Sequence, residues 1–151
     1  EIVAVMKGIC EYCRALDLGV NLETGQESPD TLLHFLEEVN RPNLGVNFDP
    51  ANMIIYGSGE PIPALRQVGR YVRSCHCKDA TWSDAPGKEF GVETPLGEGD
   101  VGIKDFITTL VELGYQGPLT IEREISGDQQ VKDIEKAINL LRSIKKELLA
   151  D

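Results

Sequence analysis

The sequence predicts an α/β fold built from parallel β/α units, and three observations support this prediction. Short apolar runs alternate with helical patterns, which is typical of a parallel sheet. Four of these apolar runs each end at a potential metal ligand, and one tetrapeptide sequence occurs twice in the chain. The four runs are 18–23, 44–49, 72–76 and 119–122. Because parallel strands point their C-termini to one face of a barrel, we expect these ends to converge in a barrel or half-barrel.

The first elements follow from apolar periodicity and from residues that begin helices. Apolar residues at three- and four-residue steps predict a helix over 1–16 with one buried face. Ser28-Pro29-Asp30 is typical of a helix start, with serine as the N-cap and proline at the first position. This helix should run to about Val39. We expect the strand at 18–23 before it and the strand at 44–49 after it.

Glycine and proline divide the rest of the chain. Gly114 is a good residue to end a helix, and a loop as long as 79–99 is typically a functional lid or disordered. The predicted elements are a loop at 57–63, a short helix at 64–71, a strand ending near 78, the long loop at 79–99, a helix at 103–113, a strand at 119–122 and a helix at 129–149.

Size and charge exclude several classes of function. The chain has 151 residues, enough for one domain, with 15 Lys and Arg against 25 Asp and Glu, a net charge of −10. This acidic balance argues against nucleic-acid and anionic-membrane partners. No apolar run is long enough to span a membrane, and no signal peptide is evident, so we expect a cytoplasmic protein. The chain begins within a helical pattern and without Met, so we expect it to be the C-terminal part of a longer protein.

The tetrapeptide Leu-Gly-Val-Asn occurs at 18–21 and again at 44–47, each time followed by an apolar residue and an acidic residue. A repeat near the length of one β/α unit supports the barrel prediction. Side chains alternate across a strand, so Asn21 should share a face with Glu23, and Asn47 with Asp49. The apolar residues between them should pack outward on the helices.

Glu23, Asp49, His76 and Glu122 are the four strand-end residues. Three carboxylates and one imidazole form a hard, oxygen-rich set that suits one divalent cation. Mn²⁺ is the favoured ion, and Mg²⁺, Co²⁺ or Zn²⁺ is also compatible. Any one of these acids alone would be read as a solvated surface residue, but the joint pattern favours a metal site. His34 lies in a helix and is expected at the surface.

The four cysteines form the pairs Cys10/Cys13 and Cys75/Cys77. A structural zinc site is one interpretation of these cysteines. Such a site needs two pairs of ligands at a CxxC-like spacing, whereas Cys75 and Cys77 form a CxC pair within a strand, which points both thiols to the same side. The favoured interpretation is small buried thiols, with Cys75 and Cys77 pointing away from His76.

Four motifs occur in a fixed order along the chain. They are Asn47-Phe48-Asp49-Pro50-Ala51-Asn52, His76-Cys77-Lys78-Asp79, Pro95-Leu96-Gly97-Glu98-Gly99-Asp100 and Gly114-Tyr115-Gln116-Gly117-Pro118-Leu119-Thr120-Ile121-Glu122. Together they resemble the xylose isomerase-like TIM-barrel superfamily, and more closely its sugar phosphate isomerase/epimerase branch. The resemblance implies that residues 1–151 form one partial domain, corresponding to strands five to eight of a (β/α)₈ TIM barrel, without its N-terminal half.

The resemblance also implies roles for individual residues. The metal would be held by Glu23, Asp49, His76 and Glu122, and in ketose 3-epimerases of the family the two glutamates form the acid–base pair. Asn52 matches a position where many relatives place a substrate-contacting histidine. An arginine that some epimerases carry after the histidine strand is replaced here, with Lys78 or Trp82 nearest. We predict Asn52, Lys78 and Trp82 as substrate-binding residues; pairing of Lys78 with an acid and simple packing of Trp82 are the alternatives.

The predicted function is a metal-dependent isomerase or epimerase of a small sugar, ketose or keto-polyol, acting through an enediolate. One glutamate would remove a proton and the other return it, while the cation polarises a carbonyl. One alternative is a lyase of the keto-inositol dehydratase type, and another is a non-catalytic half-barrel. An abasic-site endonuclease would need several more histidines for a multi-zinc cluster and a basic face, whereas this chain has two histidines and a net charge of −10. Exposed sheet edges of a half-barrel predict a homo-oligomer.

Overall fold

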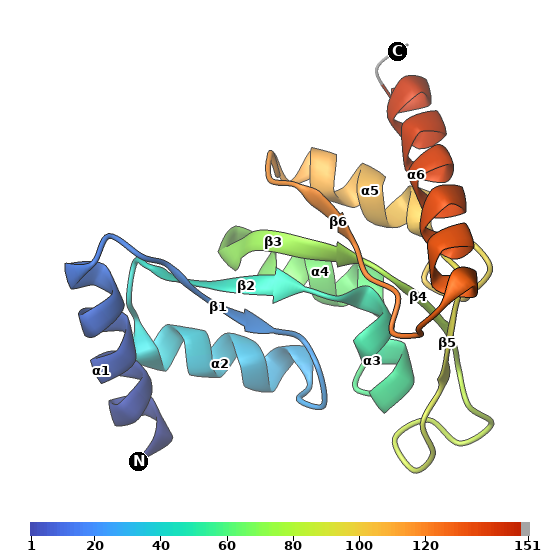
Figure 1. Ribbon diagram of the computed structural model, residues 1–151. Helices are drawn as coiled ribbons and strands as arrows, with labels where there is room; N and C mark the ends of the chain where they lie inside the picture. The colour runs from blue at the N-terminus through green and yellow to red at the C-terminus, as the bar shows by residue number, and fades with distance from the viewer. Residues whose placement is uncertain (149–151) are drawn as a thin grey trace.

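The computed structural model describes residues 1–148, and its centre is a four-stranded parallel sheet in the order β1-β2-β3-β6 (Figure 1). Its strands are β1 (Val20–Glu23), β2 (Leu44–Phe48), β3 (Val72–Cys77) and β6 (Leu119–Ile121), while β4 (Asp79–Thr81) and β5 (Val92–Thr94) form a separate antiparallel pair. The helices are α1 (Ile2–Ala15), α2 (Pro29–Val39), α3 (Pro50–Tyr56), α4 (Pro61–Val68), the short 3₁₀ helix η1 (Gly69–Tyr71), α5 (Ile103–Glu112) and α6 (Asp128–Leu148). The predicted α/β fold with parallel strands is confirmed.

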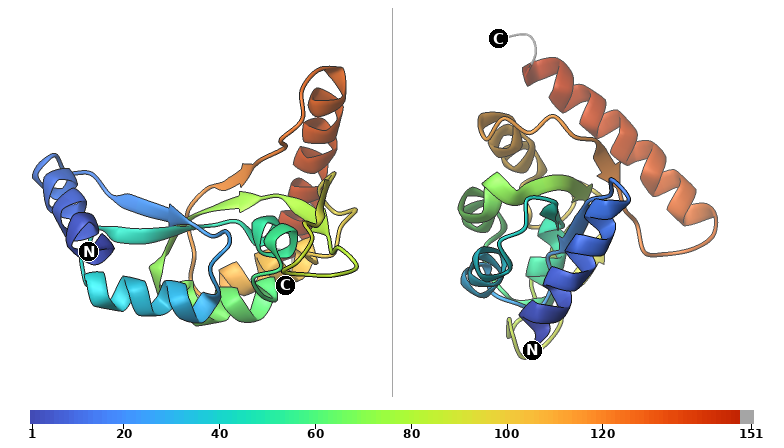
Figure 2. Two further views of the ribbon diagram at one scale, coloured as in Figure 1. Left: turned by 90° about the horizontal axis from the view of Figure 1, so that it is seen from below. Right: turned by 90° about the vertical axis from the view of Figure 1, so that its left-hand side faces the viewer.

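The helices and the sheet form two layers. Helices α2, α4 and α5 lie side by side on one face of the sheet, and α1 and α6 stand at its two ends (Figure 2). The core lies between the layers, where the stacked rings of Phe48 and Phe106 have centroids 6.0 Å apart. Asn21, Asn47 and Ser74 lie on the other face of the sheet. The predicted division into an apolar outer face and a polar inner face is therefore confirmed.

Local sequence explains several helix boundaries. Ser28 caps α2 by accepting a hydrogen bond from the backbone N–H of Thr31, as predicted, and Asn40 ends the helix in the left-handed conformation at φ 46°. Helix α5 ends next to Gly114, which has φ 75°. Both helices therefore lie where capping residues predicted them.

A β-bulge in β3 sets which side chains face the site. Val46 pairs with Val72, but the next residue, Asn47, pairs with Ser74, so Arg73 is an extra residue in β3. Val46 and Val72 are buried in the core, whereas Ser74 and the residue two further on, His76, lie on the polar face.

Asp79 organises the segment that follows β4 and β5. Its buried carboxylate accepts backbone hydrogen bonds from Gly97, Gly99 and Val101, at 2.8, 3.1 and 3.1 Å. A Cβ at Gly99 would lie 2.3 Å from Oδ1 of Asp79, so this close approach requires glycine. The glycines of the Pro95–Asp100 motif thus have a structural role. We call this set of hydrogen bonds to the Asp79 carboxylate the Asp79 clip.

The structure corrects four expectations, three of which concern secondary structure. Helix α3 was not predicted, α4 begins at Pro61 inside the predicted loop 57–63, and the predicted loop 79–99 contains strands β4 and β5. Proline at the first position begins both helices, and pairing of β4 with β5 is a tertiary contact that local patterns do not encode. The expected end of the last helix at 149 lies outside the described residues.

The fourth correction concerns α1. Its apolar positions were expected to be buried, but most are exposed, because α1 stands at the end of the sheet rather than on its face. The exposed residues are Ile2, Val5, Ile9 and Tyr12, with Leu16 and Leu18 following the helix. Cys10 is buried and Cys13 is half-buried.

Candidate metal centre

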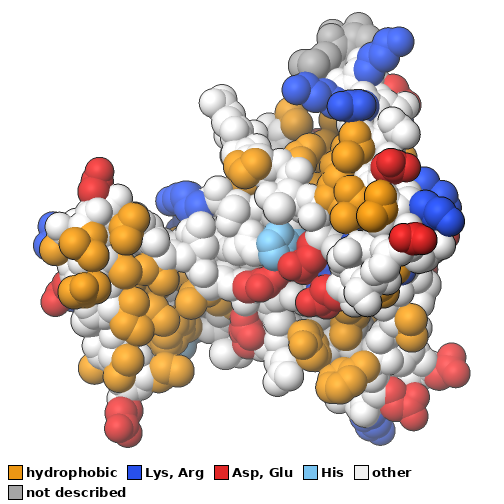
Figure 3. Space-filling view, in the orientation of Figure 1, with side chains coloured by type: hydrophobic (Ala, Val, Ile, Leu, Met, Phe, Trp, Pro, Cys, Tyr) orange, Lys and Arg blue, Asp and Glu red, His pale blue; other side chains and the backbone are white. Residues whose placement is uncertain are grey.

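Glu23, Asp49, His76 and Glu122 converge at the C-terminal ends of the four parallel strands. Each offers one ligand atom, and these atoms all lie within 4.8 Å of one another. Figure 3 shows a histidine in the middle of this face with acidic side chains beside it. The convergence expected from the strand ends is therefore present in the fold.

His76 lies at the centre of the group. Its Nδ1 atom lies 2.8 Å from Oε1 of Glu23, 3.2 Å from Oε2 of Glu122 and 3.5 Å from Oδ2 of Asp49. Its other ring nitrogen, Nε2, lies 3.2 Å from the side-chain amide of Asn47. The Asn47 atom that faces Nε2 is the amide nitrogen, which donates to Nε2 of a neutral ring. With the amide turned over, its oxygen would accept a proton carried on Nε2 and leave Nδ1 as a free ligand atom.

Two buried atoms of this group have no hydrogen-bond partner, Oδ2 of Asp49 and Nδ1 of His76. Buried polar atoms are normally paired, because desolvating them without compensation costs about 1–3 kcal/mol each. Nδ1 lies among the carboxylate oxygens, which it can contact favourably only when it is protonated, and Oδ2 belongs to one of those carboxylates. The donor set and these unsatisfied atoms fit a divalent cation.

Side-chain hydrogen bonds of Asp49 and of Thr24, the residue after Glu23, fix the ends of β2 and β1. Oδ1 of Asp49 accepts a hydrogen bond from the backbone N–H of Asn52 at 3.0 Å and so caps α3, which leaves Oδ2 for the site. The hydroxyl of Thr24 donates to the carbonyl of Asp49 and accepts from its N–H, both at 2.8 Å. The sequence analysis did not identify Thr24, although it directly follows Glu23.

The electrostatics reflect crowded negative charge. The Asp49 carboxylate raises the pKa of His76 to about 9, and Glu122 and Glu23 add to this against the opposing effect of burial. Burial raises the pKa of Glu23, as do Asp49 and Glu122, although His76 opposes the rise. In the metal-free chain the imidazolium therefore supplies positive charge to the carboxylates.

Lys78 supplies a second positive charge. Its side chain is 1% exposed, and Nζ lies 3.0 Å from Oε2 of Glu122, 2.8 Å from Oε2 of Glu124 and 3.7 Å from Oδ2 of Asp49. Burial would lower the pKa of Lys78, but Glu124, Asp49 and Glu122 together raise it. Of the two alternatives left open by the sequence, the structure shows the pairing with acids.

The other residues predicted to bind substrate occupy different surroundings. The Asn52 amide donates to the carbonyl of Thr24 at 3.2 Å, and its oxygen accepts from Lys78 at 3.2 Å, so it borders the metal-ligand group. Trp82 is half-buried and packs against the hydrophobic core, and its backbone N–H donates to the Asp100 carboxylate at 3.0 Å. A substrate-binding role for all three residues stays a prediction.

The sequence analysis missed Glu124. Its carboxylate is 62% exposed and pairs with Lys78, as given above. Its spacing of two from Glu122 was the available signal, because alternate residues of an extended segment share a side. Glu124 adds a fifth acidic or imidazole group close to the site.

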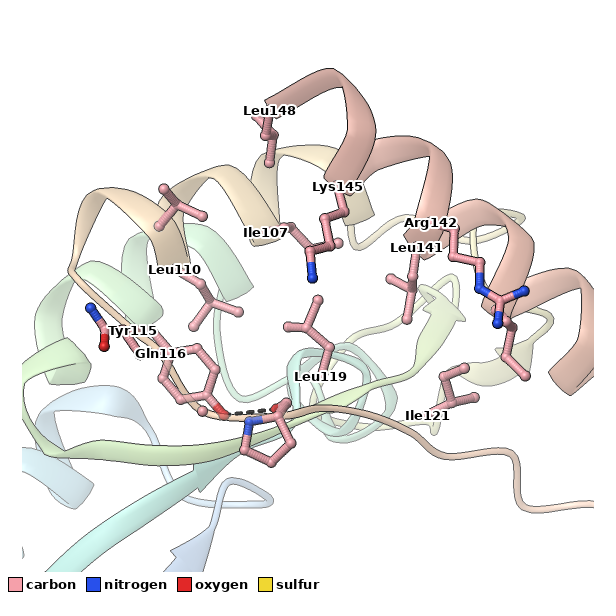
Figure 4. Close-up of a pocket in the computed structure, with 14 residues that line it drawn as sticks. Ile107, Leu110, Tyr115, Gln116, Leu119, Ile121, Leu141, Arg142, Lys145 and Leu148 are labelled. Carbon is pink, nitrogen blue, oxygen red and sulfur yellow. Dashed lines mark hydrogen bonds between the residues drawn. The ribbon is translucent and has the colours of Figure 1, made fainter. Parts of the chain in front are cut away.

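A separate cavity of about 650 Å³ lies between α5, β6 and α6 (Figure 4). Ile107, Leu110, Leu119 and Leu141 point into it, and Tyr115 at its rim donates to the carbonyl of Pro118 at 2.8 Å. Its lining contains no Asp, Glu, His or Cys, so it offers none of the usual protein ligands of a metal ion.

The cysteines do not join the metal-ligand group. Cys75 and Cys77 are free and buried on the outer face of β3, as predicted, and neither they nor Cys10 and Cys13 belong to any potential ligand cluster of residues 1–148. His34 is exposed on α2, also as predicted. Within the same range, no helix combines the length and apolarity needed to cross a membrane.

Comparison with known proteins agrees with this architecture. The family model described as xylose isomerase-like TIM barrel matches residues 1–144. A ketose 3-epimerase from Arthrobacter globiformis is 30% identical over 146 residues, which cover 87% of this chain and 44% of the relative.

Solved structures give the same result. A xylose isomerase domain protein from Planctomyces limnophilus superimposes with a TM-score of 0.95 and 55% identity, covering 99% of this chain and 54% of that one. A D-allulose 3-epimerase from Methylomonas sp. gives a TM-score of 0.64 and 25% identity, covering 82% and 42%. The chain therefore spans about half the length of the relatives it matches.

Proposed function

The chain belongs to the xylose isomerase-like TIM barrel family, and we propose that it carries the metal site of a divalent-metal-dependent isomerase or epimerase of small sugars, ketoses or keto-polyols. The observation that carries this proposal is the convergence of Glu23, Asp49, His76 and Glu122 at the ends of four adjacent parallel strands. The ketose 3-epimerase relative supports a ketose as the substrate class.

These four residues would hold the ion. Three carboxylates and one imidazole favour Mn²⁺, and Mg²⁺, Co²⁺ or Zn²⁺ is also compatible with the set. When bound, such an ion acts as a Lewis acid that polarises a substrate carbonyl. Glu23, Asp49 and Glu122 would repel one another less with a bound divalent cation than with the single proton that His76 carries in the metal-free chain.

Glu23 and Glu122 are proposed as the acid–base pair. Glu23 ends β1 and Glu122 directly follows β6, the two edge strands of the sheet, and their carboxylates lie 2.8 and 3.2 Å from His76 Nδ1. A substrate carbon between them could lose a proton to one carboxylate and regain it from the other, through an enediolate. The raised pKa of Glu23 suits a group that must accept a proton near neutral pH.

We also propose that the chain corresponds to strands five to eight of an eight-stranded barrel. Strands β1 and β6 each pair on one side only within the sheet of residues 1–148. Apolar surface lies at both edges: the exposed face of α1 beside β1, and the cavity of Figure 4 beside β6. Four further β/α units of a longer chain would cover both edges, and would supply the rest of the substrate pocket.

A Mn²⁺ titration followed by electron paramagnetic resonance tests the metal site. We expect one ion per chain for the wild type and none at the same concentrations for Asp49→Ala, while Asp30→Ala, which removes a carboxylate from the start of α2, binds like the wild type. Absence of specific binding by a wild-type chain shown folded by circular dichroism would contradict the proposal and favour the non-catalytic half-barrel.

Product analysis separates the proposal from the lyase alternative. The same residues could support loss of a hydroxyl group instead of return of a proton. On the full-length protein, an epimer or isomer of the supplied ketose would support the proposal, and a dehydrated product would support the lyase.

A further inference from the structure

Arg123 lies directly after Glu122 but points away from the metal-ligand group. Its Nη1 atom lies 3.0 Å from Oε1 of Glu93 in β5, and its Nε atom donates to Oδ2 of Asp133 in α6 at 2.9 Å. The three side chains are only 12%, 13% and 2% exposed. A buried guanidinium between two buried carboxylates is costly to break, because each remaining charge would be unpaired.

The same network also holds the backbone next to Glu122. The Glu93 carboxylate accepts the backbone N–H of Glu124 through both oxygens, at 3.0 and 3.2 Å. The carbonyl of Arg123 accepts from the Gln130 side chain at 2.8 Å. Residues 122–126 belong to no helix or strand, so these contacts take the place of regular hydrogen bonding there.

The segment Glu122–Glu124 is therefore held from two sides. On the inner side Lys78 contacts the carboxylates of Glu122 and Glu124, and on the other side Glu93 binds the side chain of Arg123 and the N–H of Glu124. In Figure 1 this segment passes β4 and β5 on its way from β6 to α6.

We propose that Arg123 is a positioning residue for the metal centre, which sets the place of the Glu122 carboxylate by anchoring the segment to Glu93 and Asp133. The inference rests on the proposed metal site. Its physical basis is that a ligand on irregular backbone keeps its geometry only where surrounding contacts fix it. The paired arrangement makes β5 and α6 supports of the metal centre, although neither contributes a ligand.

The test is the Mn²⁺ titration applied to Arg123→Met. Loss of a group hydrogen-bonded to a ligand typically weakens metal binding about 10–100-fold. Arg123 acts through the backbone that carries Glu122, so we expect the lower end of that range, a dissociation constant about tenfold higher than for the wild type. Arg41→Met is the matched control: Arg41 also pairs with a glutamate, Glu11, at 2.8 Å, but it lies before β2, at the opposite end of the strands. It should bind Mn²⁺ like the wild type.

Thermal unfolding of both variants separates positioning from general destabilisation. A dissociation constant for Arg123→Met within twofold of the wild type would overturn the inference, even if the melting temperature fell. If Arg123→Met does not fold, Glu93→Gln replaces it, because its amide oxygen still accepts the Glu124 N–H while the charge is lost. We expect it to weaken Mn²⁺ binding severalfold, and unchanged binding would overturn the inference.

A double-mutant cycle gives a further check. If Arg123 and Glu93 act as one unit, the combined variant should bind Mn²⁺ no more weakly than Arg123→Met alone. Additive losses would show that the two residues act separately and would overturn the anchoring role. A wild-type chain that binds no Mn²⁺ would overturn the proposed function itself, which distinguishes the two failures.

Discussion

The ammonium of Lys78 lies 3.0 Å from Oε2 of Glu122, so a buried lysine pairs with a carboxylate that is also proposed as a metal ligand and a proton carrier. Lys78 and a divalent cation would therefore attract the same oxygen atoms. In the metal-free chain the Lys78 ammonium supplies positive charge to these carboxylates. The stability of the fold therefore depends on whether the site holds an ion.

Replacement of Lys78 by Met should make the chain depend more on metal. Without the ammonium, the partly exposed Glu122 and Glu124 lose their counter-charge, and we expect the metal-free chain to lose about 1–3 kcal/mol of stability. Mn²⁺ should then raise the melting temperature more than it does for the wild type. An equal or smaller rise, measured by calorimetry, would argue against competition for the same carboxylates.

Metal binding should depend on pH through His76. Its pKa of about 9 means that the imidazole is protonated at pH 7, and a histidine must lose this proton before its ring nitrogen can bind a metal ion. We expect the apparent Mn²⁺ affinity to rise about tenfold per pH unit between pH 7 and 8 and to level off near pH 9. Calorimetry at pH 7 in buffers of different ionisation enthalpy should show about one proton released per ion. Affinity independent of pH would place His76 outside the site.

The stability of the metal-free chain should show the opposite trend. Because the folded-state pKa of His76 is raised above its ordinary value of 6.5, the stabilisation is full below about pH 6.5 and is lost as pH rises toward 9. Urea unfolding of the chelator-treated chain at pH 6, 7.5 and 9 measures this loss. His76→Gln should reduce the slope, and an equal slope in that variant would assign the effect to other groups.

Glu122→Gln should separate metal binding from proton transfer. The amide keeps an oxygen for the ion but cannot carry a proton at neutral pH. We expect turnover of the ketose used by the full-length protein to fall by about 10²-fold or more. Solvent deuterium uptake at the substrate carbon measures this. Turnover within a few-fold of the wild type would remove Glu122 from the acid–base pair.

Asp79→Ala should destabilise the fold without touching the ligands. It leaves the backbone N–H groups of Gly97, Gly99 and Val101 without their acceptor, at a cost of about 3 kcal/mol in total. Asp79→Asn keeps one acceptor oxygen and should lose less. Chemical denaturation compares them, and a loss below about 1 kcal/mol for the alanine variant would mean that water or a rearranged loop satisfies these groups.

The sequence predicted the parts of the fold that depend on local chemistry. Ser28 and Gly114 marked helix ends because capping acts within a few residues, and the residues ending four apolar runs marked the site because parallel strands share a direction. Helix α3 was missed although Asp49-Pro50 is itself a cap followed by proline, since Asp49 was considered only as a ligand.

The remaining features depend on contacts between distant residues. Three of these contacts join residues that lie 11 or more positions apart in the sequence. They are the pairing of β4 with β5, the hydrogen bonds of the Asp79 clip and the pairing of Arg123 with Glu93. Hydrophobic periodicity does not encode such polar pairings. Glu124 was missed for the same reason, because its partner Lys78 belongs to a different strand end.

The bulge at Arg73 decides which side chains of β3 face the carboxylates: His76, or Cys75 and Cys77. Val72 faces the core, so strict alternation from there would turn Cys75 and Cys77 toward the carboxylates and bury the imidazole of His76 among the helices. The offset of one residue reverses this phase. A strand without this extra residue would therefore present the thiols of Cys75 and Cys77 to the carboxylates in place of the imidazole, although its sequence would hold the same donor side chains.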